Sequence, residues 1–216
     1  MEVSIIIATH GDASWEALAQ SRPFPSARAE PAEVLIGHDP DGNRATVRNS
    51  LAEHASGDYL CFLDGDDELR SGYVPAMQRA FEIEDTDEPL LLTPRVSYVV
   101  KGRPRAPKFW PVPDLWSGNW MVVGTLVRKD LFLEVGGWRE FDEADWNEWD
   151  DWELWIRCQK AGARPVKVPK AVYVAHQEST SRHRGLSTEH KLRWTYEIGR
   201  MHFPEHYPIG WQGQGL

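Results

Sequence analysis

Short apolar runs that end abruptly in polar loops dominate the first third of the chain. Residues 3–8, 33–37 and 59–63 are rich in β-branched and aliphatic side chains, and a polar segment follows each of them. Continuous apolar runs of this length are typical of strands buried on both faces of a parallel sheet. Between them, apolar residues recur at helical spacing in 14–20 and 44–55. This order predicts an α/β fold whose mostly parallel central sheet is flanked by helices.

The remaining elements alternate less regularly. We expect further helices at 71–83, 129–135, 150–160 and 188–202, and strands at 90–92, 96–100, 120–127, 165–168 and 171–175. Pro23, Pro25 and Pro31 predict an irregular connection, and the basic, proline-rich stretch 101–113 predicts a surface loop. We interpret residues 1–181 as a single domain with halves 1–101 and 102–181, followed by a tail, 182–216, that contains the last helix.

Polar residues follow each of the first three predicted strands. The carboxyl ends of parallel strands meet at one edge of a sheet, so Thr9, Asp39 and Asp64 should lie side by side there. Asp64, Asp66 and Asp67 place three carboxylates within four positions, and Gly65 lets a ligand approach the backbone. Mutual repulsion of these acids favours a compensating cation, for which Mg²⁺ or Mn²⁺ with a phosphate-bearing substrate fits best. The alternative is an acidic turn that caps the next helix, but the apolar strand in front favours a site.

A second pair of acids, Asp150 and Asp151, begins a predicted helix between Trp149 and Trp152. Acids at a helix N-terminus often only compensate the helix dipole. The aromatic flanks make a partly buried carboxylate plausible, and such a group can act as a general base. His176, at the end of a short strand, becomes relevant only if the fold returns it to the first group of acids.

Composition narrows the functional classes. The chain has 216 residues and a net charge of −9, which argues against nucleic acid or an anionic membrane as a general partner. No stretch approaches the roughly 20 apolar residues of a membrane helix. Cys61 and Cys158 lie in apolar surroundings and predict free thiols in a reducing compartment, so we expect a cytoplasmic protein. The 11 Trp residues suit core packing and sugar stacking equally well.

The order of these motifs resembles that of the family 2 glycosyltransferases, which have the GT-A fold with a Rossmann-like N-terminal half. The matching pieces, in order, are Val3 to Thr9 (Ala8 replaces the family's proline), Arg48-Asn49, Gly57-Asp58-Tyr59, Asp64-Gly65-Asp66-Asp67, Val122 to Arg128, Gly136-Gly137-Trp138, Asp150-Asp151, Leu154-Trp155-Ile156-Arg157, and His176 with the serines after it. The match runs from residue 3 to about residue 181. The sequence departs from the family pattern at two further places. The first acid of the Asp150-Asp151 pair is Asp instead of Glu, and the segment from Asp39 to Arg48 is shorter than in the family.

The resemblance implies a metal-dependent, inverting transfer of a sugar from a nucleotide-diphosphate donor, with a UDP-sugar favoured. On the donor side, it implies that Thr9 and Asp39 border the base and ribose and that Arg48 lies near the base or diphosphate. It also implies that Asp64, Gly65 and Asp66 form the Asp-x-Asp (DXD) motif. Asp64 and Asp66 would hold Mn²⁺ or Mg²⁺, with His176 as a further ligand.

On the acceptor side, the resemblance implies that Asp151 is the general base. We add Trp138, Trp149, Trp152 and Asp150 as an acceptor-binding surface, together with Trp146. The acceptor itself, a glycan, lipid or protein, is not specified by the sequence.

Two alternatives remain open at this point. A nucleotidyltransferase shares a similar sheet and metal-bound acids, although it usually has a glycine-rich, basic loop after the first strand. A catalytically inactive domain could instead use its tryptophans to bind a sugar or a protein.

Overall fold

The computed structural model describes residues 1–109, 114–141, 149–177 and 188–207. Its strands are β1 (Val3–His10), β2 (Glu33–Asp39), β3 (Tyr59–Asp64), β4 (Glu68–Leu69), β5 (Leu90–Val100), β6 (Arg103–Pro104), β7 (Val127–Arg128) and β8 (Arg164–Gln177). Its helices are α1 (Ala13–Ser21), α2 (Pro23–Arg28), α3 (Arg44–His54), α4 (Tyr73–Glu84), α5 (Lys129–Glu134), α6 (Asp150–Lys160) and α8 (Thr188–His202). No helix of the described part is long and apolar enough to cross a membrane.

The strands form two sheets that run into one another. In the first, ordered β2-β1-β3-β7, the three N-terminal strands are parallel, as the apolar runs predicted. In the second, ordered β4-β8-β5-β6, the long strands β5 and β8 are parallel. Leu126 links the two sheets because it bridges Leu92 of β5 directly before β7 begins.

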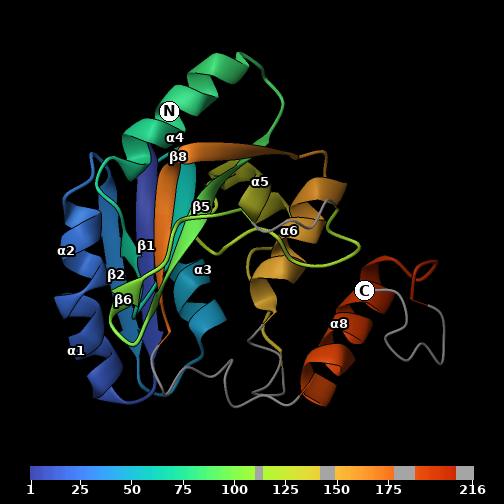
Figure 1. Cartoon of the computed structure of the whole chain (residues 1–216), viewed down its shortest axis with the longest axis horizontal. Helices are drawn as coiled ribbons and strands as arrows, with labels where there is room; N and C mark the ends of the chain where they lie inside the picture. The colour runs from blue at the N-terminus through green and yellow to red at the C-terminus, as the bar shows by residue number, and fades with distance from the viewer. Residues whose placement is uncertain (110–113, 142–148, 178–187, 208–216) are drawn as a thin grey trace.

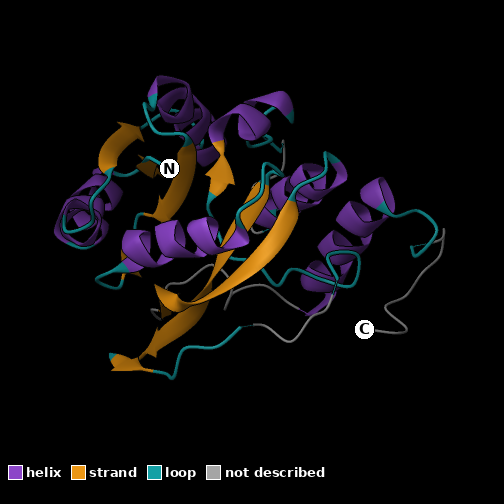
Figure 2. Cartoon of the chain, turned by 90° about the horizontal axis from the view of Figure 1, so that it is seen from above, coloured by secondary structure: helices purple, strands orange, loops and turns teal. Residues whose placement is uncertain are grey.

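Helices cover both faces of the first sheet (Figures 1 and 2). α1 and α2 pack on β1 and β2 from one side, and α3 packs on the same strands from the other. The β1–β2 connection moves one place along the sheet, and the β2–β3 connection moves back in the opposite direction past β1. Right-handed crossovers then place their helices on opposite faces. The α/β architecture with a mostly parallel sheet is therefore confirmed.

Several predicted elements differ from the structure. Only the end of the stretch 120–127 is a strand, since β7 begins at Val127. Before it, the Thr125 N–H donates to the Val122 carbonyl and closes a turn, and the apolar residues of this part fill the core from a loop. Pro23 and Pro25 lie in the first turn of α2 instead of a loop, since proline suits the start of a helix, whereas Pro31 does lie in the connection before β2. β5 and β8 are each one long strand where we expected two short ones, with an irregularity in the ladder between Pro94 and Arg95.

The N-terminus of α4 is capped from a distance. The helix predicted at 71–83 begins after Gly72, which has a φ of 82° and no side chain to act as a cap. The buried carboxylate of Glu30 instead accepts hydrogen bonds from the Gly72 and Val74 N–H groups at 2.8 and 2.9 Å. A cap supplied by another element leaves no local sequence signal.

Candidate active site

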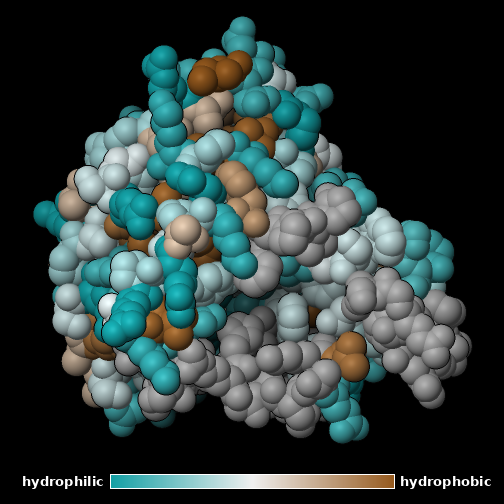
Figure 3. Space-filling view, viewed as in Figure 1, coloured by the Kyte–Doolittle hydropathy of each residue, from teal (hydrophilic) through white to brown (hydrophobic). Residues whose placement is uncertain are grey.

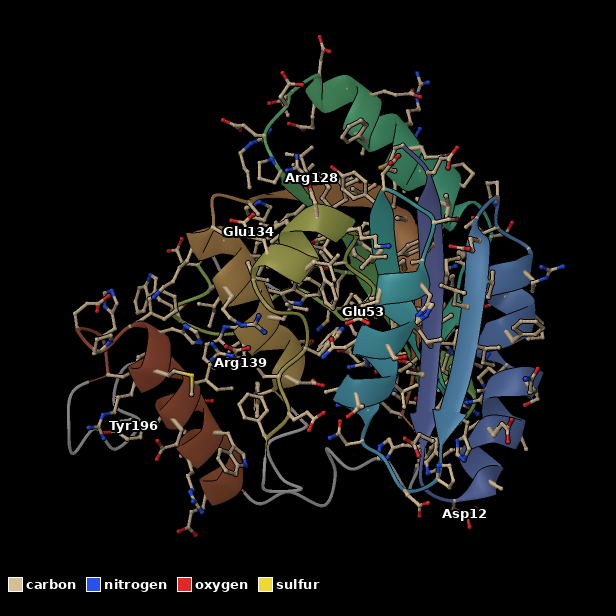
Figure 4. All side chains as sticks on the ribbon, turned by 180° about the vertical axis from the view of Figure 1, so that it is seen from behind. Asp12, Glu53, Arg128, Glu134, Arg139 and Tyr196 are labelled. Atoms are coloured by element: carbon tan, nitrogen blue, oxygen red, sulfur yellow. The ribbon has the colours of Figure 1, made fainter. Side chains whose placement is uncertain are left out.

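The carboxyl ends of β1, β2 and β3 lie side by side along one edge of the sheet. Thr9 is opposite His38, His10 is opposite Asp39, and Ala8 is opposite Asp64. In Figure 4 this edge lies at the bottom, near the labelled Asp12 that follows β1. The predicted convergence of the three strand ends is confirmed.

Two of these strand ends are already held by local hydrogen bonds. Thr9 Oγ1 lies 2.9 Å from His38 Nδ1. Asp39 Oδ1 accepts from the Asp41 and Gly42 N–H groups, both at 3.0 Å, and so closes its own turn. Asp39 is partly exposed, and its contact with a ribose or a base stays a prediction.

The acidic turn after β3 is tight. The Asp67 N–H donates to the Asp64 carbonyl at 3.1 Å. A Cβ on Gly65 would lie 2.7 Å from Thr9 Cγ2, so the close approach of β1 requires glycine here. Burial, followed by the charge of Asp64, raises the pKa of Asp66 to about 6. The turn therefore holds a carboxylate whose charge is not fully compensated by the protein.

Asp67 and His176 are joined by the backbone. The His176 N–H donates to Asp67 Oδ1 at 2.8 Å, and burial raises the pKa of this carboxyl well above its usual range. The ring Nε2 of His176 lies 2.8 Å from Glu68 Oε2. The fold thus returns His176 to the acidic turn, with its ring on Glu68. The described residues contain no preformed group of three or more His, Cys, Asp or Glu side chains that could hold a metal.

Arg48 connects the two acidic motifs. Its side chain is 2% exposed, and its Nη2 pairs with Asp64 Oδ1 while its Nη1 lies 3.1 Å from Asp150 Oδ2. The guanidinium also lies over the Trp138 ring, 4.2 Å from its centroid. The guanidinium is therefore committed to two acids and an indole, and we no longer expect it to contact the base or the diphosphate.

Asp150 is also a structural residue. It is 6% exposed, and its Oδ2 accepts from both Arg48 and Arg44, the latter at 2.9 Å. Its Oδ1 accepts from the Asp151 N–H at 2.9 Å. Both oxygens thus already accept hydrogen bonds within the protein, and we no longer propose Asp150 as an acceptor-binding residue.

Asp151 is the member of the pair with the raised pKa. Burial, followed by the charges of Asp150 and Asp64, raises its pKa to about 7, although hydrogen bonds from the Trp152 N–H and Asn119 oppose this rise. The Trp152 N–H donates to Asp151 Oδ1 at 2.7 Å. A carboxylate that is partly exposed and has a pKa near neutrality can accept a proton from a hydroxyl.

The tryptophans near this pair are mostly core residues. Trp138 and Trp152 are 2% and 0% exposed, so neither presents a ring face to an acceptor, and their predicted role in acceptor binding is wrong for this structure. Trp149 is partly exposed and stands edge-to-face to Trp152 at 6.0 Å, so for Trp149 the prediction stands. Trp146 lies outside the described residues.

Sequence reasoning missed three residues that shape the site: Arg44, Asn119 and Tyr173. Tyr173 is buried, and its hydroxyl accepts from the Asp64 N–H at 3.3 Å. Asn119 Oδ1 accepts from the Met121 N–H at 3.1 Å, which directs the amide NH₂ group away from that backbone. Of the three, only Arg44 could have been placed from the sequence, because it directly follows Asn43, which caps the N-terminus of α3 beside the strand ends.

The last helix is fastened to the helix that carries Asp151. Glu153 of α6 is fully buried, and its carboxylate pairs with Arg157, Arg139 and His202, the last at 3.0 Å. Figure 4 shows Arg139 between α6 and α8. Burial alone would raise the pKa of Glu153, but its hydrogen bonds to His202 and Arg157 hold it below its usual value. The charged cluster therefore packs α8 against α6.

A family model described as "Glycosyl transferase family 2" matches residues 4–136. Among solved structures, TarS 1-349 of S. aureus in complex with UDP-GlcNAc superimposes with a TM-score of 0.62 at 14% identity over 93% of this chain. The same protein in complex with UDP gives 0.62 at 14% identity over 94% of this chain and 66% of that one. A third TarS 1-349 structure gives 0.61 at 15% identity over 96% of this chain and 82% of that one.

The chain spans 65% of the TarS 1-349 structure with UDP-GlcNAc. A search of curated proteins found no match. At these identities the solved structures establish the fold, which is that of the GT-A glycosyltransferases. The family follows from the match over more than half of the chain: this protein belongs to glycosyl transferase family 2.

Proposed function

We propose that this protein transfers a sugar from a nucleotide-diphosphate sugar, with a UDP-sugar favoured, to an acceptor hydroxyl with inversion. The observation that carries the proposal is the Arg48 bridge between Asp64 and Asp150. It brings the acids after β3 and the first turn of α6 into one site, as a transferase with donor and acceptor halves requires. The TarS structures with UDP and UDP-GlcNAc support a uridine-diphosphate donor by similarity of fold.

In this proposal, the ends of β1 and β2 receive the nucleoside, and the turn after β3 receives the diphosphate. Thr9 and Asp39 border the base and ribose. Asp64, Gly65 and Asp66 line the ribose and diphosphate, where the absent side chain of Gly65 leaves the backbone accessible. Asp151 faces the acceptor.

A divalent cation fits the residues of the acidic turn. Asp66 is a partly exposed carboxylate with a raised pKa, which indicates local negative charge in excess, and oxygen ligands suit Mg²⁺ and Mn²⁺. Asp66 and Asp64 would hold the ion, whereas His176 would join them only after its ring leaves Glu68. Bound there, the cation would supply charge stabilisation to the departing diphosphate.

Different residues of the chain then have separate roles in the reaction. Asp151 removes the proton of the acceptor hydroxyl, and the acceptor oxygen forms a bond to the anomeric carbon from the side opposite the diphosphate. The bond between that carbon and the phosphate oxygen breaks, and its electron pair leaves with the nucleoside diphosphate. Arg48 and Arg44 hold Asp150, and hence the first turn of α6, in place throughout.

Calorimetric unfolding with UDP-, GDP- and dTDP-sugars, each with and without Mn²⁺, tests the proposal. A true donor binds the folded state and raises the unfolding temperature by mass action. The proposal fails if no nucleotide sugar stabilises the protein in the presence of Mn²⁺. Sugar transfer or donor hydrolysis is then assayed with the nucleotide that stabilises most.

The rate of transfer should depend on the protonation of Asp151. Only the deprotonated carboxylate can accept a proton, and its pKa is about 7. We therefore expect kcat to rise roughly tenfold per pH unit below about pH 7 and to level off above it. A pH profile at saturating donor and Mn²⁺ measures this, and a flat profile across this range would exclude Asp151 as the base.

Mn²⁺ should stabilise the fold through Asp66. The raised pKa of Asp66 means that the folded chain holds this proton more tightly than the unfolded chain, so stability is lost as pH rises from the usual 3.8 to about 6. With UDP and Mn²⁺ at 100-fold over their dissociation constant, we expect the unfolding temperature to rise by about 5–10 °C at neutral pH, and by less in acid.

Asp66→Asn should remove most of the Mn²⁺-dependent rise, while the exposed Asp87→Asn on the α4–β5 loop should keep it. An equal rise in both variants would place the cation elsewhere.

A further inference from the structure

One stretch of this acidic protein is entirely free of acids. Between Glu88 and Asp114 the sequence contains no Asp or Glu, yet it holds Arg95, Lys101, Arg103, Arg105 and Lys108. The net charge of the whole chain is −9, so this segment is basic in an otherwise acidic protein. Lys101, Arg103 and Arg105 are exposed, and among the described residues none of the three is paired with an acid.

These side chains are displayed on an ordered hairpin. Lys101 and Gly102 both have positive φ angles, 51° and 71°, which close a tight turn of the kind favoured in hairpins. Beyond the turn, Val100 pairs with Arg103, and the Arg105 N–H donates to the Tyr98 carbonyl at 2.7 Å. Two residues apart on an extended chain, Arg103 and Arg105 project on the same side, with about 6.8 Å between their Cα atoms.

The hairpin begins beside the candidate active site. β5 runs parallel to β8, so that Val99 lies opposite His176, whose ring contacts Glu68 next to the acidic turn. Figure 1 shows β6 and the start of α6 along the same lower side of the molecule, and Figure 3 shows a largely hydrophilic surface in the region of β6. In Figure 2 the paired ends of β5 and β6 stand out from the body of the domain.

Described residues that follow the hairpin in sequence contact the rest of the domain. Lys167 lies over the rings of Phe109 and Trp120, 5.7 and 5.1 Å from their centroids. Trp152 Nε1 donates to the Leu115 carbonyl at 2.8 Å, so Leu115 contacts the helix that carries Asp151.

We propose that the acceptor carries phosphate groups and that the hairpin of Lys101, Arg103 and Arg105 binds them. This inference rests on the proposed function, because it names the substrate class of the same site. The donor diphosphate is assigned to the turn after β3, so the hairpin on the second sheet serves another anion. Guanidinium groups bind phosphate oxygens in a bidentate manner. Because the guanidinium groups of Arg103 and Arg105 project on the same side, they suit a chain that carries phosphates at repeated intervals.

Fluorescently labelled inorganic polyphosphate is the probe for this hairpin, with labelled dextran as the neutral counterpart. The test variant is Arg103→Gln/Arg105→Gln, and the matched control is Arg28→Gln/Arg79→Gln, which removes two exposed charges from α2 and α4. We expect wild type and control to bind polyphosphate but not dextran, and the hairpin variant to bind about tenfold more weakly. UDP binding, measured on all three proteins, should be unchanged.

The inference is overturned if the hairpin variant keeps its affinity for polyphosphate, or if the control loses as much. Binding of the wild type to vesicles of pure phosphatidylglycerol, without binding to polyphosphate, would also overturn it, because the hairpin would then recognise a membrane surface. If the wild type failed to bind UDP, that result would count against the proposed function alone. The two failures are therefore distinguishable.

Discussion

Replacing Asp151 with asparagine is expected to lower kcat for sugar transfer by roughly 100- to 10,000-fold, the usual contribution of a positioned general base. The amide keeps the shape of the side chain but cannot take the acceptor proton. UDP affinity should change little, because the proposed donor contacts lie at the ends of β1 to β3, which pair side by side. Initial rates and UDP titrations on the same preparation measure both quantities.

The matched control is Asp87→Asn, an exposed acid on the loop between α4 and β5, which should keep wild-type kcat. Removal of the Asp151 charge also relieves repulsion from Asp150 and Asp64, so the variant should be at least as stable as the wild type. If Asp151→Asn retained kcat within a factor of a few, the general base would have to be another group.

Replacing Arg48 with methionine should impair both stability and catalysis. Breaking a buried ion pair by removing one partner costs about 3–5 kcal/mol. We expect the lower end of this range, since Asp64 is 28% exposed and Asp150 keeps Arg44. Urea denaturation measures the loss, and kcat should also fall roughly 100-fold because the first turn of α6 is no longer held against β3.

Two comparisons separate this positioning role from a contact with substrate. Arg79→Met, on an exposed face of α4, should change stability by less than about 0.5 kcal/mol. In a double-mutant cycle with Asp150→Asn, the effects should be clearly non-additive, since the two side chains pair directly. An Arg48→Met variant of normal stability with only a raised KM for the donor would show instead that Arg48 binds the nucleotide.

The contacts of α8 give the helix that carries Asp151 a second support. The family model ends at residue 136, before α6 and α8 begin. Glu153 nevertheless connects these two helices through His202, and Lys160 Nζ donates to the His202 carbonyl. The position of Asp151 therefore depends on a buried charged cluster in the part of the chain beyond the matched residues.

Local patterns in the sequence were sufficient to predict much of the framework. The apolar runs at 3–8 and 59–63 gave buried parallel strands, and the helix predicted at 150–160 is α6 with the same limits. The polar residues after the strands were correctly placed at one edge because parallel strands with right-handed crossovers allow no other arrangement. These features depend on neighbours within a few positions, which a sequence displays directly.

The partners of individual side chains were decided only by the tertiary structure. Arg48 and Asp150 are 102 positions apart, and nothing near either residue indicates that they form a pair. Burial of Trp138 and Trp152, and the cap of α4 by Glu30, likewise depend on which surfaces the packed elements bring together. The sequence by itself therefore determined where the strands end and which acids follow them. Packing decided that Arg48 joins the two acidic motifs, that Asp150 pairs with two arginines, and that the pKa of Asp151 is raised, because desolvation and charge pairing exist only in the assembled fold.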